Sequence, residues 1–589
     1  MENASNFDPY FQKLLGNLFG EVDEAVLKEF FESGTLKTVD TGEYLFKQGD
    51  VQNELYVVLS GRLRALQDNE GKMVILGDIG EGEPVGEIAL FTSEPRMASV
   101  LAVRRSSVLE INKQQYASIV SKSPDFAAAL TRFVIKRLRR NILQQHVEAA
   151  PKNIAIFHLQ QNEDISSFVE ALRTQLTHDF LEAKVYSKKE TPIGQLFDSL
   201  ESHKGTNLMY CNGSEPEWTK HCLIYADLVV VLSSSEAESK LSELEESNGL
   251  YQPGVLNKKT ILVLLHEKDT PRPVNTKEWL EERPVNLHLH IRKENPKDLR
   301  RLSRMLTNRA VGLVLGGSGT KGYAHVGAVK ALLNAGIEVD FVGGTSAGAV
   351  YGIAMTYADF EFKKIEQICQ QSTAQDEGVN DFFLKMFSNT TETGIEAYFK
   401  KLFGESCLED LWVTSYCVST NLSNSQIRVH NKGKIWEQVQ ASFALPGIFP
   451  PVVIEDQVYV DGGVSDNLPV EPMYRYPVKH IIAISLNGSE PEDVAAKEFS
   501  KKWERLKEAF AKDKKYDNPA LTSVLVNSMT LNSKQKAEIT KSKVSLYFEM
   551  NLRAVSLLDD SKWEKVVKKG YEQTRDFLGG LSGNEVFWG

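Results

Sequence analysis

Two glycine-rich turns, each lying between an apolar run and a helical pattern, constrain the C-terminal half of this 589-residue chain most strongly. AVGLVL at residues 310–315 has the composition of a buried strand, and GGSGTKG at 316–322 follows it and leads into YAHVGAVKALLNAG. EVDFVGG then predicts a second strand, and GTSAG at 344–348 leads into the helical run AGAVYGIAMTYA. Strand, tight turn and helix in repeated succession predict an α/β fold.

The same turns carry groups suited to acyl transfer. Ser346 is the serine of GTSAG, where Gly344 and Gly348 permit a strand-to-helix turn that exposes the hydroxyl. The glycine loop before it would present free backbone N–H groups at a helix N-terminus, a suitable oxyanion hole in which each donor contributes roughly 3–4 kcal/mol. Asp461 ends the strand-like run QVYVD before Gly462 and Gly463, which would let its carboxylate approach the serine. Together the motifs predict a serine hydrolase without an obvious triad histidine.

Other chemistries can be weighed against this prediction. Gly317, Gly319 and Gly322 also satisfy GxGxxG, the dinucleotide-binding fingerprint, but that fold needs an acidic residue at the end of the second strand, where this chain has Ser346. A Walker A loop is disfavoured because Thr320 replaces its required glycine. A Ser-His-Asp triad would use His480, which begins an apolar strand. We expect His480 to be structural, and His325 to pack or cap at its helix start.

The segment from 309 to 577 resembles the patatin-like phospholipases, through these motifs and through ASFALPGIFPPV at 441–452 and YVDGGVSDNLPV at 459–470. The resemblance implies a Ser-Asp dyad with Ser346 as nucleophile and Asp461 as base, and no catalytic cofactor or metal. It also implies an oxyanion hole formed by Gly317, Ser318 and Gly319, supported by Lys321, Gly322, Gly344, Gly348, Gly462 and Gly463. Two residues depart from the family pattern: Ser318 replaces a commoner glycine, and Lys321 stands where many members have arginine.

The resemblance implies long-chain acyl esters as substrates, with lysophospholipids or phospholipids as the leading class and transient contact with a membrane surface. Two apolar patches, FFLKMF at 382–387 and AYFKKLF at 397–403, would form either a lid or core helices. A catalytically inert, cyclic-nucleotide-responsive scaffold is the alternative function, because Ser318 departs from the pattern of the oxyanion loop.

Composition narrows the setting. The net charge of −11 argues against nucleic acid as a partner, and five cysteines without CxxC spacing favour a reducing cytoplasm over a disulfide framework or zinc site. His288 and His290 alternate on a strand, but no third metal ligand lies at suitable spacing. The sequence contains no signal-peptide pattern and no apolar stretch of 18 residues. We therefore expect a cytoplasmic protein that meets lipid peripherally at the inner face of a membrane.

The first 125 residues consist of short alternating runs separated by glycines, a pattern typical of a β-roll. Within them PVGEIALFTSEPRMASV offers backbone N–H groups and a guanidinium for a phosphate, and a carboxylate for a ribose hydroxyl. The segment resembles the phosphate-binding cassette of cyclic-nucleotide-binding domains. The resemblance implies a regulatory site for cAMP or cGMP lined by Gly86, Glu87, Ile88, Arg96, Ala98 and Ser99.

An amphipathic helix at 126–147, with a basic cluster at 136–140, follows the roll; in cyclic-nucleotide-binding domains such a helix often dimerises or transmits the signal, so a homodimer is one option. Alternating strand and helix patterns then predict a small doubly wound α/β domain without a glycine-rich phosphate loop. Through EWTKHCLIYADLVVVL at 217–232 and KEWLEERPVNLHLHIR at 277–292, this segment resembles the region before the hydrolase in neuropathy target esterase and its bacterial relatives. The sequence thus predicts a multidomain protein, with a β-roll at 1–150, an α/β domain at 151–300 and a patatin-like α/β hydrolase at 301–589.

Overall fold

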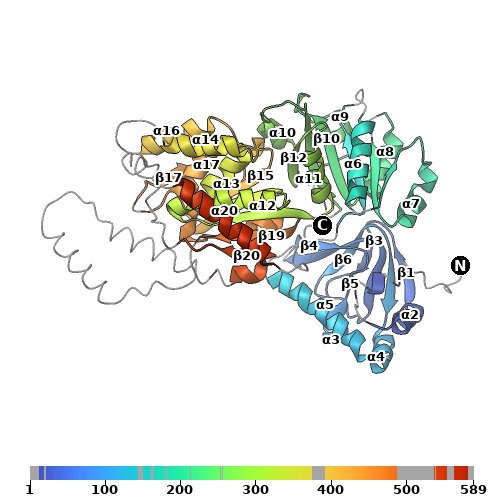
Figure 1. Cartoon of the computed structure of the whole chain (residues 1–589). Helices are drawn as coiled ribbons and strands as arrows, with labels where there is room; N and C mark the ends of the chain where they lie inside the picture. The colour runs from blue at the N-terminus through green and yellow to red at the C-terminus, as the bar shows by residue number, and fades with distance from the viewer. Residues whose placement is uncertain are drawn as a thin grey trace, which may run out of the picture. The chain divides into compact units, whose positions relative to one another are not determined.

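The chain divides into two compact units, which are considered separately. The computed structural model describes residues 12, 14–16, 18, 22–69, 71–142, 150–160, 165–179, 182–211, 214–252, 254, 256–373, 392–446, 448–486, 536, 539–552 and 563–581. The first unit comprises Met1–Asp269 and Glu278–Asn308, and the second comprises Thr270–Lys277 and Arg309–Gly589. The first unit contains a β-roll and an α/β domain, and the second contains an α/β domain with a larger sheet (Figure 1).

The β-roll is an antiparallel sheet with the strand order β1-β6-β3-β4, in which β2 pairs with β6 and β5 with β3. Its central strand β3 is buried on both faces: Leu55 and Val57 pack towards the flanking helices, whereas Tyr56 and Val58 fill the interior of the roll. This alternation is the period-two pattern expected of a strand. The elements are α2 (Glu24–Ser33), β1 (Thr35–Val39), β2 (Tyr44–Phe46), β3 (Leu55–Asn69), β4 (Lys72–Ile79), β5 (Pro84–Val85), α3 (Glu87–Thr92), β6 (Ser99–Ile111), α4 (Lys113–Lys122) and α5 (Pro124–Ile142).

The second domain of this unit is a six-stranded parallel sheet with the order β12-β11-β10-β7-β9-β8. Its first strand, β7, lies between β9 and β10, so the direction of winding reverses there and the sheet is doubly wound, as predicted. The elements are β7 (Asn153–His158), α6 (Ser166–His178), β8 (Ala183–Tyr186), α7 (Ile193–Ser202), β9 (Thr206–Cys211), α8 (Pro216–Tyr225), β10 (Leu228–Ser234), α9 (Glu243–Ser247), β11 (Lys259–His266), α10 (Thr276–Glu282), β12 (Leu287–Arg292) and α11 (Pro296–Leu306).

The second unit is built on an eight-stranded mixed sheet with the order β17-β18-β15-β14-β13-β19-β20, in which β16 pairs with β15. Strands β15, β14, β13, β19 and β20 run parallel, and β18 runs antiparallel to β15. The elements are β13 (Ala310–Leu315), η1 (Gly319–Gly322), α12 (Tyr323–Asn334), β14 (Phe341–Thr345), α13 (Ala347–Tyr357), α14 (Phe362–Thr373), α16 (Glu392–Phe403), η2 (Leu408–Asp410), β15 (Thr414–Asn421), β16 (Gln426–His430), α17 (Ile435–Phe443), β17 (Val452–Ile454), β18 (Gln457–Asp461), η3 (Gly462–Val464), η4 (Glu471–Arg475), β19 (Val478–Ser485), β20 (Leu546–Glu549) and α20 (Trp563–Gly579).

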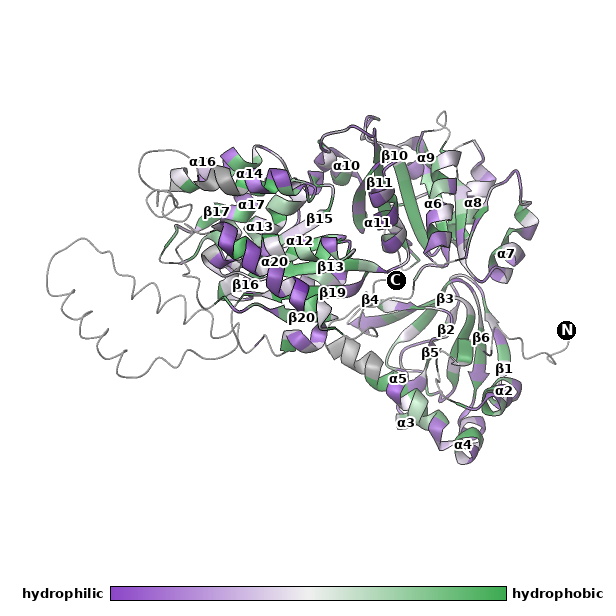
Figure 2. Ribbon diagram, viewed as in Figure 1, coloured by the Kyte–Doolittle hydropathy of each residue, from purple (hydrophilic) through white to green (hydrophobic). Residues whose placement is uncertain are grey.

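Helices α12, α13, α17 and α20 share one hydrophobic core with alternate residues of β13, namely Val311, Leu313 and Leu315. Apolar residues are concentrated on β13, whereas the outward face of α20 is hydrophilic (Figure 2). Phe399 and Phe403 of α16 are fully buried in this core, so the 397–403 patch forms part of a core helix; the 382–387 patch lies outside the described residues.

Helices α12 and α20 approach each other closely because each has a glycine at the contact. A Cβ on Gly327 of α12 would overlap the backbone of Val567, and a Cβ on Gly570 of α20 would overlap the backbone of Ala324. Because α12 begins directly after the glycine loop, α20 supports the helix that carries this loop.

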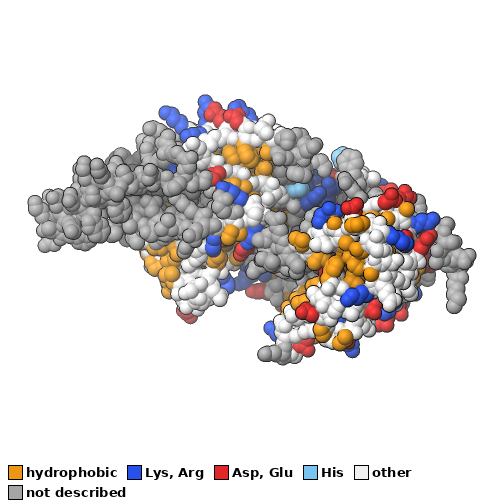
Figure 3. All heavy atoms as spheres, turned by 90° about the horizontal axis from the view of Figure 1, so that it is seen from below, with side chains coloured by type: hydrophobic (Ala, Val, Ile, Leu, Met, Phe, Trp, Pro, Cys, Tyr) orange, Lys and Arg blue, Asp and Glu red, His pale blue; other side chains and the backbone are white. Residues whose placement is uncertain are grey.

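The described surface is mixed in character. In the view of Figure 3, hydrophobic side chains lie among Lys, Arg, Asp and Glu side chains on the described parts of the surface. None of the helices in the described ranges is long and apolar enough to cross a lipid bilayer.

Candidate functional site

Ser346 lies in the turn between β14 and α13 with φ 53° and ψ −125°, a backbone conformation that L residues seldom adopt. A Cβ on Gly344 would lie 2.6 Å from the carbonyl carbon of Gly348, and one on Gly348 would overlap the carbonyl oxygen of Leu315. The turn therefore needs glycine at both positions. The N–H of Ser346 donates to the Ser442 hydroxyl at 3.1 Å, and this contact helps to hold the strained residue in place.

The glycine loop packs directly against this turn. A Cβ on Gly317 would lie 2.8 Å from the Cβ of Ser346, and one on Gly322 would lie 2.6 Å from the Tyr351 ring. Gly319 has φ 53°, whereas Ser318 is not among the described residues with positive φ. Serine is therefore compatible with the backbone at 318, and the departure from the family's glycine creates no strain there.

Of the three predicted oxyanion donors, one is already engaged. The Gly317 N–H donates to the Asn467 carbonyl at 3.2 Å. The hydrogen bonds among described residues include none from the N–H groups of Ser318 and Gly319. Lys321, which is half-buried, donates its own N–H to the Ser318 carbonyl at 3.2 Å.

Asp461 ends β18 at the rim of the sheet, and only 1% of its surface is exposed. Oδ1 accepts the N–H of Gly463 at 2.7 Å. A Cβ on Gly462 would overlap the Val418 carbonyl, so glycine is needed for this close approach to β15. Burial raises the pKa of Asp461 to about 6, opposed by hydrogen bonding from the Ser346 hydroxyl and the Gly463 N–H.

Ser346 and Asp461 thus lie close enough for the Ser346 hydroxyl to influence the pKa of the Asp461 carboxyl. The Oδ2 atom of Asp461 is buried and has no partner within hydrogen-bonding distance among the described residues. A carboxylate with a pKa near 6 is largely ionised at neutral pH and yet is a stronger base than an exposed aspartate. The arrangement can therefore accept the proton of a serine that attacks an ester.

The histidines of this unit lie in other settings. His480 pairs with Val311 in the β19–β13 ladder. The pair Leu315 and Ile484, four residues further along these strands, lies near the rim that carries Ser346. At roughly 3.3 Å per residue this places His480 about 13 Å from that rim. His325 is fully buried and bonds through Nε2 to the Gly316 carbonyl at 2.8 Å, and burial lowers its pKa to about 4. As predicted, His325 packs at the start of its helix.

Two residues at the site have no role in the sequence-based prediction. Asn467 donates from Nδ2 to the Gly317 carbonyl at 2.9 Å, and Ser442 donates to the Val418 carbonyl at 2.7 Å while accepting the N–H of Ser346. Both lie in segments whose resemblance to the family was evident. In each segment the sequence shows a polar residue near apolar ones, and this pattern does not identify the hydrogen-bond partner of that residue.

In the β-roll, the predicted cassette forms β5, α3 and the start of β6. Arg96 is 3% exposed and donates from Nη1 to the Gly86 carbonyl at 3.0 Å. Gly86 has φ 88°, and a Cβ there would lie 2.5 Å from Nη1, so only glycine fits beside this guanidinium. The Ser99 hydroxyl accepts the N–H of Gln48 at 2.9 Å. Glu87 is buried, and Ile88 and Ala98 are half-buried.

Arg96 is also held by Glu54, which the sequence did not single out. Nη2 donates to the Glu54 carbonyl at 2.9 Å and lies 3.5 Å from the Glu54 carboxylate. The guanidinium lies 4.2 Å from the centre of the Phe46 ring, a cation–π arrangement. Nε is buried and has no hydrogen-bond partner among the described residues.

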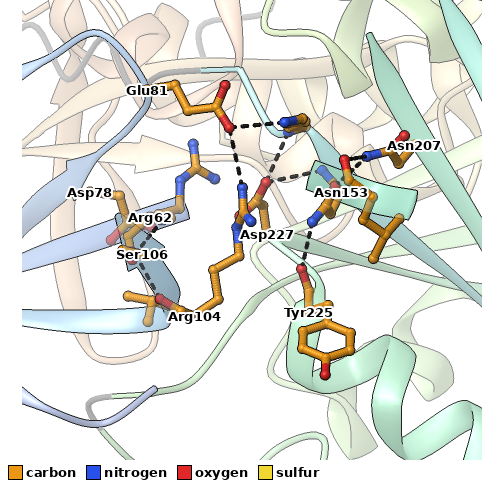
Figure 4. Close-up of polar contacts among 12 residues, drawn as sticks. Arg62, Asp78, Glu81, Arg104, Ser106, Asn153, Asn207, Tyr225 and Asp227 are labelled. Carbon is orange, nitrogen blue, oxygen red and sulfur yellow. Dashed lines mark hydrogen bonds and ion pairs between the residues drawn. The ribbon is translucent and has the colours of Figure 1, made fainter. Parts of the chain in front are cut away.

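A buried ionic network joins the β-roll to the neighbouring α/β domain (Figure 4). Arg104 of β6 donates from Nε to Asp227 at 2.9 Å, lies 3.8 Å from Glu81 and also contacts Glu201. Lys152 pairs with Glu81 at 3.0 Å. These contacts tie both domains of the first unit together.

Asp227 is the centre of this network. Its Oδ2 accepts the N–H groups of Lys152 at 2.9 Å and Asn153 at 3.0 Å. Although burial acts to raise its pKa, Arg104, Arg62 and the backbone hydrogen bond lower the pKa of Asp227 to about 2. The carboxylate therefore stays ionised while almost fully buried.

The α/β domain of this unit has no glycine between β7 and α6, as the sequence already showed. Where its winding reverses, Gln160 donates to the Ser233 hydroxyl at 2.9 Å and accepts the Ser234 N–H at 3.0 Å. His290 hydrogen-bonds to His266 at 3.0 Å, and the described residues include no group of three or more His, Cys, Asp or Glu side chains able to hold a metal.

Three family models match successive parts of the chain. Residues 36–123 match a model described as cyclic nucleotide-binding domain, and residues 156–316 match one described as Neuropathy Target Esterase family P-loop like domain. Residues 313–474 match a model described as Patatin-like phospholipase. The third match contains the glycine loop, Ser346 and Asp461.

Curated relatives match most of the chain at low identity. Patatin-like phospholipase domain-containing protein 7 of Mus musculus is 26% identical over 91% of this chain and 44% of the relative. Lysophospholipase nte1 of Aspergillus fumigatus is 26% identical over 92% of this chain and 41% of the relative. The chain thus spans less than half the length of these relatives.

Among solved structures, the N-terminal domain of a transcriptional regulator from Streptomyces coelicolor is 29% identical, with a TM-score of 0.20. That similarity covers 23% of this chain and 95% of the other.

Proposed function

Since this chain joins a cyclic nucleotide-binding domain and a neuropathy-target-esterase-type P-loop-like domain to a patatin-like phospholipase domain, we propose that it is a serine-dependent lipid esterase. Its substrates are phospholipids or lysophospholipids, whose acyl ester bonds it hydrolyses. The curated relatives, one of them named a lysophospholipase, support this substrate class.

One observation carries the proposal: a strained, glycine-flanked serine lies beside a buried aspartate whose pKa is raised to about 6. Asp461 takes the hydroxyl proton as Ser346 attacks the ester carbonyl, and N–H groups of the glycine loop stabilise the oxyanion. The alcohol leaves with a proton from Asp461. Water, deprotonated by the same carboxylate, then hydrolyses the acyl-enzyme.

A dyad is preferred to a triad because of the positions of the histidines. His480 lies several residues away from the sheet rim that carries Ser346, and His325 is committed to the Gly316 carbonyl. The Ser346 hydroxyl influences the pKa of Asp461, which supports the role of this carboxylate as the base without an intermediary.

The β-roll regulates the hydrolase by binding a cyclic nucleotide, cAMP or cGMP, at Arg96. Glu81 lies shortly before the cassette strand β5 and pairs with Arg104 and Lys152, so a movement of the cassette reaches the adjacent α/β domain through this carboxylate. Lipid is met at a membrane surface. We propose that the protein is cytoplasmic and that this contact is transient and peripheral.

The test is release of fatty acid from lysophosphatidylcholine by the wild type, Ser346→Ala, Asp461→Asn and His480→Ala, each with and without cAMP or cGMP. Activity should disappear in the first two variants and persist in the third. Strong loss in the histidine variant would overturn the dyad. Absence of wild-type hydrolysis, together with failure of a fluorophosphonate probe to label Ser346, would instead support an inert, nucleotide-responsive scaffold.

A further inference from the structure

The side chain of Asn467 lies between the loops that carry the two halves of the site. It is 8% exposed, and Nδ2 donates to the Gly317 carbonyl at 2.9 Å while its own backbone carbonyl accepts the Gly317 N–H at 3.2 Å. Oδ1 lies 2.7 Å from where a Cβ on Gly317 would be and 2.9 Å from where one on Gly463 would be. The carboxamide is therefore enclosed by the glycine loop and by the turn after Asp461.

The turn that carries Asn467 is itself held against the nucleophile strand. Thr345, the residue before Ser346, donates its hydroxyl to the Asp466 carbonyl at 3.0 Å. Gly463, on the other side, donates its N–H to Asp461. Asn467 thus contacts the glycine loop directly, and the turn that carries it is tied to the other two motifs of the site.

The hydrogen bond to the Gly317 carbonyl has a geometric consequence. The peptide bond is planar and trans, so the carbonyl of Gly317 and the N–H of Ser318 belong to one rigid unit and point in opposite directions. Nδ2 of Asn467 fixes the direction of the carbonyl and thereby also fixes that of the Ser318 N–H. The latter points away from Asn467, in a loop whose Gly317 adjoins the Cβ of Ser346.

We propose that Asn467 is a positioning residue that aims the Ser318 N–H at the developing oxyanion. Ser318 and Gly319 then supply the donors, because the N–H of Gly317 is engaged with Asn467 itself. The inference rests on the proposed hydrolase function. In this proposal residue 318 acts through its backbone N–H and not through its side chain, which explains why serine is tolerated at that position.

The test compares Asn467→Ala and Asn467→Asp with wild type on a soluble short-chain ester at pH 8. Misdirecting one oxyanion donor should lower kcat by roughly 10- to 100-fold and leave KM within about twofold, since removal of a donor costs 10²–10³ in kcat. The aspartate variant should lose at least as much activity as the alanine variant, because it removes the donor and sets a negative charge against the Gly317 carbonyl oxygen, which turns the peptide away from its wild-type direction. A purely structural role predicts the reverse order, since aspartate has nearly the shape of asparagine.

Asn421→Ala is the matched control. Asn421 is also a buried asparagine of this unit, 4% exposed. Its side chain donates to Gln457 at 3.1 Å, and neither residue belongs to the glycine loop. Its kcat should stay within a few-fold of wild type. Equal losses in the Asn421 and Asn467 variants, or a rise in KM with unchanged kcat, would refute the positioning role.

A crystal structure of Asn467→Ala separates this inference from the proposed function. The peptide between 317 and 318 should be rotated or occupy two orientations, while Ser346 and Asp461 keep their places. An unchanged peptide would overturn the inference even in an active enzyme. If wild type hydrolyses no ester, the proposed function fails, and the peptide orientation still decides whether Asn467 directs the loop.

Discussion

A Cβ on Gly317 would lie 2.8 Å from the Cβ of Ser346 and 2.7 Å from Oδ1 of Asn467. Both distances are shorter than side chains tolerate, so Gly317→Ala should push the loop away from the serine. We expect kcat to fall by about 100-fold or more, comparable to the loss of an oxyanion donor. Gly579→Ala, at a position with open space around it, is the control and should leave kcat unchanged. Normal kinetics in Gly317→Ala would show that the loop adapts freely.

The pH dependence of hydrolysis follows from Asp461. The carboxylate must be ionised to accept a proton, and burial raises its pKa to about 6. We therefore expect kcat/KM to fall about tenfold per pH unit below pH 6 and to reach a plateau above it. The profile of His480→Ala should keep the same inflection. A shifted inflection in that variant would indicate that the histidine takes part in the titration.

Asp461→Asn should stabilise the fold while abolishing activity. The folded-state pKa of Asp461 is raised from 3.8 to about 6, so the native state binds more protons than the unfolded state between these values. Stability is therefore lost as pH rises through this window, by about 3 kcal/mol above pH 6. The Tm of Asp461→Asn should exceed that of wild type at pH 7.5, and the difference should disappear below pH 4. A variant less stable than wild type at pH 7.5 would contradict this reasoning.

Arg104→Met should strongly destabilise the first unit. The change leaves Asp227 buried without its nearest cation, a situation that costs on the order of 3–5 kcal/mol. Adding Asp227→Asn should recover part of this loss, because the amide oxygen can still accept the Lys152 and Asn153 N–H groups without carrying a charge. Urea denaturation of both variants measures the effect.

Arg173→Met is the control for this experiment. Its carboxylate partner Glu170 is exposed, so the change should leave the urea midpoint close to that of wild type. If Arg104→Met and Arg173→Met unfold at the same urea concentration, the buried network contributes little to stability.

We expect the wild-type Glu54 carboxylate to weaken cyclic-nucleotide binding, because it lies 3.5 Å from the Arg96 guanidinium and competes with a phosphate for it. Glu54→Gln should lower the Kd for cAMP or cGMP severalfold, whereas Arg96→Leu should abolish binding. Isothermal titration calorimetry of both variants and wild type gives the comparison. A higher Kd in Glu54→Gln would mean that the carboxylate helps to form the site.

Much of this architecture was predictable because its signals are local. Apolar runs and glycine turns predicted β13, β14 and β18 within a few residues, and Ser346 lies in the strand-to-helix turn that GTSAG indicated. The predicted helix at 126–147 begins within α5, whereas 143–147 and the side chains of 136–140 lie outside the described part of the chain.

The supporting residues could not be predicted in the same way. Asn467 acts on a loop 150 residues earlier in the chain, and Arg104 pairs with Asp227 across two domains. Such contacts depend on how strands are ordered and how domains pack, which a single sequence does not reveal. Glu54 likewise lies in no motif of the sequence, and its role depends on the fold that places it beside Arg96.

The close packing of α12 on α20 shows that the phospholipase-like domain needs more of the chain than its motifs occupy. The matched phospholipase region ends at residue 474, yet Gly327 of α12 rests on the backbone of a helix that begins at Trp563. A protein trimmed to the matched region would keep every motif and lose the helix against which its glycine loop is braced. A definition of this domain by its signature residues alone would therefore overlook an element on which the geometry of those residues depends.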